Sequence, residues 1–307
     1  MLEALIRATC SPRGEFVSRP DQLRCLTLLL AFSAIAHASQ RPDTSTRAVV
    51  AAAAAYVADY QKQLTSVLAD ERYTQDVITQ IPRDASMPRA RRMTSEVFFM
   101  FAPGTHDWMA IRDVIAMDEG AIEGRPDIKA ALRTLPASDV AATFKTYNSR
   151  FNIGRTYRNF NEPTLSLLVL DANHRERFSF KRKRVQHAGD TVLVTLTFVE
   201  KESPTLIRDL RRGRVFSTGE VVVEAGTGRV HRAVLEAKTK DVKLELTTTY
   251  SPDDRLGMWV PTLFREQYEH GLSPDSRNLD ARFEYEHIVC EATYRNYRRF
   301  ETSVRIK

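Results

Sequence analysis

Residues 219–250 carry the clearest pattern of apolar and polar positions in the chain. From residue 242 to residue 250, apolar or neutral side chains alternate one by one with charged residues and threonines. A period of two is typical of a half-buried antiparallel strand. Two earlier runs rich in Val, Leu and Thr precede it, and Gly226 and Gly228 supply the backbone freedom of a tight turn between them. The pattern predicts a three-stranded meander with one solvated face and one covered face.

Further segments rich in β-branched and aromatic residues predict strands on both sides of the meander. Pro82 ends the first of them, a turn at Gly104 separates the second from the third, and Gly189 lies in the turn of a later hairpin. The predicted strands are residues 71–81, 92–101, 107–117, 177–185, 191–201, 258–268 and 281–301.

Helical periodicity appears at the start of the folded part and again in the middle of the chain. Between residues 48 and 68, apolar side chains recur at spacings of three and four. This pattern predicts an amphipathic helix that packs on the sheet through Tyr56, Tyr60 and Leu64. A helical insertion is predicted over residues 126–173, with helices that begin near three successive prolines. Its last apolar run reads equally as a buried strand, and the polar residues before it favour a helix.

These elements predict an α+β fold. We expect a curled antiparallel sheet of about ten strands, an incomplete barrel, with a long N-terminal helix and the mid-chain helical insertion laid into its concave side. Such an arrangement encloses either a filled core or a cavity for an apolar ligand. The residues leave both alternatives open.

The first residues predict an export signal rather than folded structure. Residues 26–35 form an apolar run preceded by Arg24 and followed by Ala36-His37-Ala38, which predicts a signal peptide over residues 1–38 with cleavage before Ser39. An uncleaved membrane anchor is the alternative. Acidic residues and prolines before the run indicate a mis-assigned start codon. We expect a single periplasmic or secreted domain over residues 39–307.

Composition and motifs exclude several classes of function. The net charge of +6 is spread along the chain, and the basic run at residues 181–184 is expected to divide its charges between two strand faces. Neither feature indicates nucleic-acid binding. Cys290 is the only cysteine after the signal, so the mature chain has no intrachain disulfide. No nucleophile motif, phosphate loop or paired-histidine metal motif is present, which predicts a protein that is not an enzyme and has no cofactor.

One set of residues with metal-binding side chains was weighed against an ordinary strand surface. Glu269, His270, Glu286 and His287 fall on two predicted strands that are able to pair. Exposed polar positions on strands are the interpretation that we favour, and we predict no metal site.

Several segments of the chain are similar to a family of uncharacterised secreted bacterial proteins. They are AAAAYVADYQKQLTSVLADE, FNIGRTYRNFNEPTLSLL, FVEKESPTLIR, MWVPTLFREQY and YRNYRRFE, and they extend over nearly all of the mature chain. The order of elements also resembles the LolA/LolB-like periplasmic lipoprotein-carrier fold. By analogy of layout, that resemblance implies a concave apolar sheet face that accepts acyl chains.

The functional hypothesis from the sequence is therefore binding of lipid or lipoprotein acyl chains, with peripheral membrane contact as a further expectation. A structural or interaction domain with a filled core is the alternative, and an undetected hydrolase ranks third. The residues expected to line the ligand site are Trp108, Phe198, Leu244, Leu246, Trp259 and Phe264.

Overall fold

The structure is a computed structural model that describes residues 41–79, 89–102, 104, 106–156, 158, 162–209, 213–271 and 285–300. Arg41–Lys307 form one compact unit. The predicted signal peptide and its cleavage site lie outside the described residues and remain predictions. Among the helices described, none is long and apolar enough to cross a membrane.

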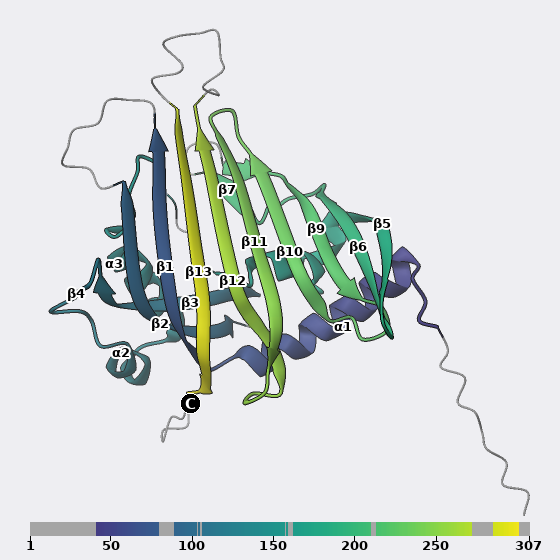
Figure 1. Ribbon diagram of the computed structural model, residues 1–307, viewed down its shortest axis with the longest axis horizontal. Coiled ribbons are helices and arrows are strands. Elements are labelled where there is room, and N and C mark those ends of the chain that lie inside the picture. Colours follow the sequence, from purple (N-terminus) through teal and green to yellow (C-terminus); the bar gives the residue numbers. More distant parts are fainter. Residues whose placement is uncertain are drawn as a thin grey trace, which may run out of the picture. The chain divides into compact units, whose positions relative to one another are not determined.

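The fold is built on one antiparallel sheet of eleven strands that does not close on itself (Figure 1). Its order is β4-β3-β2-β1-β13-β12-β11-β10-β9-β6-β5, so β4 with β3 forms one edge and β5 the other. A separate two-stranded ribbon, β7-β8, lies in a segment for which the sequence predicted no strand. The predicted α+β class with a curled, incomplete barrel is confirmed. The strands are β1 (Val67–Thr79), β2 (Ala90–Ala102), β3 (Asp107–Met117), β4 (Gly120–Ala121), β5 (Phe178–Ala188), β6 (Thr191–Glu200), β7 (Ile207–Asp209), β8 (Gly213–Val215), β9 (Ser217–Glu224), β10 (Val230–Lys238), β11 (Val242–Asp253), β12 (Met258–His270) and β13 (Glu286–Arg299).

The long helix α1 (Thr46–Leu64) crosses one face of this sheet. Ser45 caps it, accepting a hydrogen bond from the Ala48 N–H at 3.3 Å. Tyr60 and Leu64 are buried, as the sequence predicted, whereas Tyr56 is partly exposed and stacks on Tyr60 at 5.6 Å. The predicted end at residue 68 is wrong, because Ser66 takes a positive φ of 62° and the next residues pair with β2 as the start of β1.

The mid-chain insertion covers both faces of the sheet rather than the concave side alone. Helices α2 (Ile128–Thr134) and α3 (Ala137–Ser149) pack with Phe98 and Ile111 on one face of β2 and β3. Phe99 has the opposite strand parity, and it belongs with α1 to the main core on the other face, called here the inner face. The 3₁₀ helix η1 (Leu165–Leu170) is almost wholly buried in that main core, followed by the short turn η2 (Arg175–Arg177). The predicted third helix is therefore present, in 3₁₀ form.

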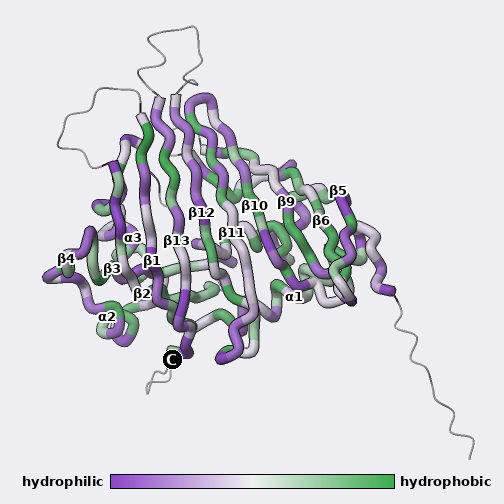
Figure 2. The backbone as a smooth tube through the Cα atoms, in the orientation of Figure 1, coloured by the Kyte–Doolittle hydropathy of each residue, from purple (hydrophilic) through white to green (hydrophobic). Residues whose placement is uncertain are grey.

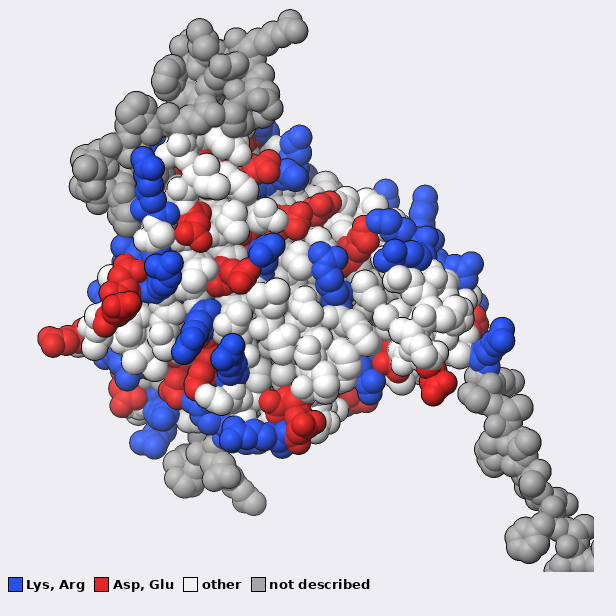
Figure 3. Space-filling view, viewed as in Figure 1, with Lys and Arg blue, Asp and Glu red and all other residues white. Residues whose placement is uncertain are grey.

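Cross-strand register sets the character of the inner face. One row of paired residues runs across the sheet, and its members are Gln75, Cys290, Glu266, Leu246, Leu235, Gly219 and Phe198. The half formed by β6, β9, β10 and β11 is apolar in this row, whereas the half formed by β1, β13 and β12 carries polar groups. Figure 2 shows the alternation of hydrophilic and hydrophobic positions along the strands that produces the two faces. The face turned to the viewer in Figure 3 carries charged side chains of both signs.

Truncation of Leu64 tests how tightly α1 is bound to the core. Its side chain is 0% exposed, so Leu64→Ala should lower the free energy of unfolding by about 2–5 kcal/mol. The control is Lys62→Ala on the same helix, whose side chain is 78% exposed and which should change stability by less than about 0.5 kcal/mol. Urea unfolding measures both. A loss at Leu64 as small as that at Lys62 would show that the helix is only loosely attached.

Candidate functional site

The six predicted ligand residues all belong to the main core or pack against it, but they do not line one hollow. Phe198, Leu244, Leu246 and Phe264 are buried in the main core of the inner face, with exposures of 1–5%. Trp108 is also buried, at 3% exposure, but on β3 near the edge of the sheet. Trp259 is partly exposed and packs beside the ring of His231 at 4.4 Å. Of the six, Trp108 alone lines the hollow described next, and the ligand role of all six remains a prediction.

A hollow of about 410 Å³ lies beside the first half of β3. Its volume is within the range of roughly 300–1,000 Å³ that is typical of small-molecule pockets. The lining comes from β3, α3, η1 and the segment before β7, so it joins elements that are distant in the sequence. We call it the β3 hollow, and its apolar lining residues are Trp108, Met109, Ala110, Ile111, Ala141, Ala142, Phe144, Leu165, Leu168 and Leu206.

The β3 hollow lies alongside a stretch of β3 whose outer edge has no strand partner among the described residues. β4 pairs with β3 only at Ala116 and Met117. The side chain of Asn148 donates a hydrogen bond to the Arg112 carbonyl at 2.6 Å, which shows that the backbone of Arg112 points to this edge. Residues of one parity in an antiparallel strand present their backbone groups to the same edge, so those of Trp108 and Ala110 point there too. Free backbone donors and acceptors therefore accompany the apolar lining.

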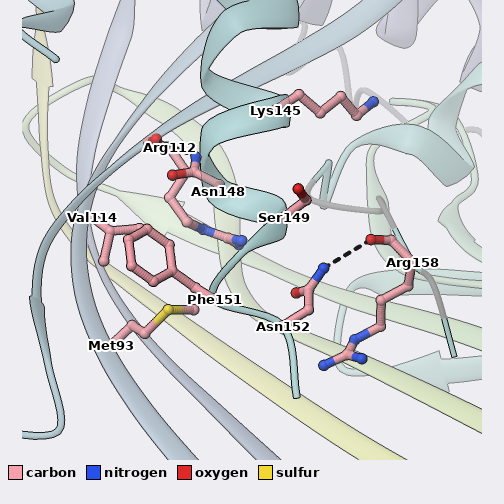
Figure 4. A pocket seen from close by; sticks show the side chains of 9 residues that line it. All are labelled: Met93, Arg112, Val114, Lys145, Asn148, Ser149, Phe151, Asn152 and Arg158. Carbon is pink, nitrogen blue, oxygen red and sulfur yellow. Dashed lines mark hydrogen bonds between the residues drawn. The ribbon is translucent and has the colours of Figure 1, made fainter. Parts of the chain in front are cut away.

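The inner end of the β3 hollow is polar and adjoins a second, much smaller cavity. Arg112, Lys145 and Asn148 line both. The smaller cavity holds about 10 Å³, which is enough for roughly one water molecule. Figure 4 shows it between Arg112 of β3, the end of α3, and Arg158 with Asn152 on the other side. Asn148 Oδ1 and Arg158 Nε are buried without a hydrogen-bond partner among the described residues, as expected of groups that take up a bound water.

A buried ion pair fixes Arg112 at the boundary between the β3 hollow and the core. Its Nε and Nη2 donate to the two carboxylate oxygens of Glu71 at 2.5 and 2.8 Å, and its guanidinium lies 4.5 Å from the ring centre of Tyr73. Arg112 and Glu71 are 3% and 0% exposed. Burial lowers the pKa of Arg112, but the charge of Glu71 outweighs it and raises that pKa overall. Because both charges are desolvated, loss of either partner would leave the other unpaired and costly.

A second buried acid, Glu266 of β12, lies deeper on the inner face. It accepts hydrogen bonds from the hydroxyl of Tyr73 at 3.0 Å and from that of Tyr268. Burial raises the pKa of Glu266, and the hydrogen bond from Tyr268 opposes this only in part. Burial likewise raises the pKa of the nearby Cys290 thiol to about 12, so the thiol is un-ionised and unreactive at neutral pH. Neither group lines the β3 hollow or the water-sized cavity, and both are buried in the interior.

The set weighed as a metal site is divided by strand register. His270 pairs with Glu286 across β12 and β13, and Glu269 pairs with His287, so the two pairs project from opposite faces of the sheet. The carboxylate of Glu286 also accepts hydrogen bonds from the backbone N–H groups of Arg155 and Thr156 at 2.9–3.1 Å. Within the described residues, no group of three His, Cys, Asp or Glu side chains lies close enough to hold a metal ion.

The alternation of residues along β1 predicts the polar half of the core, although the search for catalytic and metal motifs did not find it. Glu71, Tyr73 and Gln75 alternate with exposed residues and share the parity of the buried Val77. Polar residues at every second position, in step with a buried apolar residue of the same strand, are expected to face inward and to need hydrogen-bond partners. Their partners, Arg112 and Arg158, come from distant segments, and no local pattern identifies them.

Comparison with known proteins gives little further information. No family model matches the chain, and no curated protein matches it. Among solved structures, the chain is similar to a "putative outer membrane lipoprotein-sorting protein domain" from Vibrio parahaemolyticus. The alignment covers 81% of this chain and 93% of that chain, with 9% sequence identity and a TM-score of 0.30. A similarity this low establishes neither the family of the chain nor its function.

Replacement of Glu266 by Gln tests whether its carboxyl is held in a low-dielectric core. Since its pKa is raised above the usual 4.5, the native state binds this proton more tightly than the unfolded chain does. The contribution of Glu266 to stability should therefore fall as the pH rises from 4.5 towards the raised pKa. Urea unfolding of both proteins over this range should show Glu266→Gln gaining stability relative to the wild type as the pH rises. A difference that stays constant with pH would contradict the raised pKa.

Proposed function

We propose that this protein is a non-catalytic binding protein that takes up an acyl chain of a lipid or lipoprotein in the β3 hollow. The observation that carries the proposal is the hollow itself, about 410 Å³ in volume with ten apolar lining residues from four separate parts of the fold. An apolar chain that enters it leaves water, and each buried CH₂ contributes roughly 0.8 kcal/mol.

The polar end of the β3 hollow supports a ligand with one polar head. Lys145 lies there with its ammonium 3.2 Å from Glu162, and the unpartnered Asn148 Oδ1 lies one helical turn further along α3. An ester, amide or carboxyl head finds both charged and neutral partners at this end. The apolar side chains of Trp108, Phe144 and Leu168 then surround the chain.

The same ligand is able to reach the predicted residues of the inner face if η1 moves. Leu165 and Leu168 line the β3 hollow, and the rest of η1 is buried in the main core that contains Leu246 and Phe198. A longer chain would displace η1 and occupy part of the inner face, which is the concave face that the sequence resemblance implies as the acyl site. An exported protein, as the signal segment predicts, meets such ligands at the cell envelope.

Intrinsic fluorescence tests acyl binding directly, because the chain has two tryptophans. In a Trp259→Phe background, Trp108 is the remaining emitter. Titration with a long-chain fatty acid and with an N-acylated hexapeptide should shift its emission and raise the melting temperature with ligand concentration. Ala141→Phe, which fills the hollow, should abolish both effects, and Ala55→Phe on the exposed side of α1 should keep them. A flat titration with both ligands would reject the proposal.

A second candidate ligand is an extended peptide, and the free edge of β3 favours it. Backbone groups of Trp108 and Ala110 face the β3 hollow, and an acyl chain would cover them without giving hydrogen bonds in return. A peptide strand added to this edge would satisfy them, and its alternate side chains would enter the apolar lining. The function in that case is that of an interaction domain.

Substitution of Ala110 by proline distinguishes acyl binding from the addition of a peptide strand. The Ala110 N–H points to the free edge, so Ala110→Pro removes a donor that only an added strand uses. If a peptide strand binds, the variant should lose at least tenfold in affinity for the acylated hexapeptide and keep its affinity for the fatty acid. Fluorescence titration in the Trp259→Phe background measures both. Equal retention of the two ligands would exclude strand addition and leave acyl binding as the function.

A further inference from the structure

The opposite edge of the sheet concentrates positive charge. A β-bulge at Lys183 shifts the register of β5 against β6, so that Arg182 pairs with Leu196 and Arg184 with Thr195. Leu196 lies on the inner face and Thr195 on the outer face, and cross-strand partners share a face. The bulge therefore brings Arg184 to the outer face, together with Lys181 and Lys183. The charges of residues 181–184 therefore divide between the two faces, as the sequence predicts, but three lie on the outer face and only Arg182 on the inner face, because one inserted residue changes the parity of the strand.

A hollow of about 510 Å³ lies beside the inner side of the same strand, between β5 and the first turns of α1. Val50, Ala51 and Phe180 give it an apolar floor, and Arg47 and Arg175 stand at its sides. Arg182 lies next to it and donates to the carbonyl of Thr44 at 2.9 Å. Apolar surface and cationic groups thus meet at this edge of the sheet. We call β5, η2 and the start of α1 together the basic edge.

Most cations of the basic edge have no acidic partner in the part of the chain that the structure describes. Residues 43–51 and 175–188 contain seven Lys or Arg and two Asp or Glu, a balance of +5 in a chain whose total is +6. Among the described residues, Arg47, Arg175, Lys181 and Arg184 form no ion pair, and Lys183 pairs with Glu220. Figure 3 shows blue side chains gathered over β5 and β6. Unpaired cations concentrated at one edge of the sheet repel one another, and a multivalent anionic surface would relieve the repulsion.

We propose that the basic edge docks on the surface of a lipid bilayer that contains anionic phospholipids. Arg47 and Arg175 bind the phosphate of one lipid, and the upper part of its acyl chain lies against Phe180 and Val50. Lys181, Lys183 and Arg184 lie along the neighbouring headgroups. Charge complementarity identifies the partner as anionic, and the apolar floor between the arginines favours a lipid over a purely polar polyanion. This docking is independent of ligand binding in the β3 hollow, which lies at the other edge of the sheet.

Co-sedimentation with vesicles tests the proposal. The full chain should bind vesicles of phosphatidylcholine with phosphatidylglycerol at low salt, bind them more weakly as salt is added, and fail to bind pure phosphatidylcholine. Two double variants remove cations of the basic edge, Lys181→Gln with Arg184→Gln and Arg47→Gln with Arg175→Gln. Each should weaken binding by about fivefold per cation removed. The matched control, Arg72→Gln with Arg133→Gln, loses the same charge elsewhere on the exposed surface and should bind almost as the wild type does.

Three results would overturn the proposal: no binding to the anionic vesicles at low salt, equal binding to neutral vesicles, or equal losses in the test and control variants. Phe180→Ser tests the contact with the lipid. Vesicle binding should fall in this variant, whereas binding of a purely polar polyanion such as heparin should stay the same. Circular dichroism confirms that each variant is folded. Ala141→Phe, which closes the β3 hollow, should leave vesicle binding unchanged, so failure of one proposal is distinguishable from failure of the other.

Discussion

The structure depends on one constraint, which is that its eleven-stranded sheet does not close. A closed barrel would hide both edges and fill its own interior. An open sheet instead leaves an apolar inner face that other elements must cover, and two edges whose backbone groups need partners or water. Helix α1 and η1 cover the inner face, and the α2–α3 pair covers the other face of β2 and β3. The β3 hollow and the basic edge occur at the two edges, where this covering ends.

The covered interior is unusual in its division into an apolar and a polar half. Glu71 with Arg112 and Glu266 with two tyrosine hydroxyls are held in the buried interior at a desolvation cost that close hydrogen bonds offset. Partners so specific fix the position of β3 relative to β1 and β12 more precisely than apolar contacts do. They therefore also fix the walls of the β3 hollow, since Arg112 belongs to both structures.

The packing of the interior favours a ligand at an edge of the sheet over a ligand on the centre of the concave face. A ligand on the centre of the concave face would have to replace η1, whose leucines are 0–1% exposed where they are buried in the main core. A ligand at an edge replaces only water. The two edges differ in chemistry, because one offers free backbone groups beside apolar side chains and the other offers unpaired cations beside Phe180. The proposals of acyl binding and of membrane docking thus concern separate places on one scaffold.

The sequence by itself determined the strand-rich α+β class, the amphipathic first helix and most strand positions, because these follow from local periodicity. It also contained the inward parity of Glu71, Tyr73 and Gln75. Only the tertiary structure decided which edge of β3 stays free, because strand neighbours such as β1 and β13 are more than 200 residues apart in the chain. It alone decided the face of Arg184, because a bulge inverts parity without a sequence signal. The β3 hollow is also tertiary in origin, since its lining joins β3, α3 and η1, which are distant from one another in the chain.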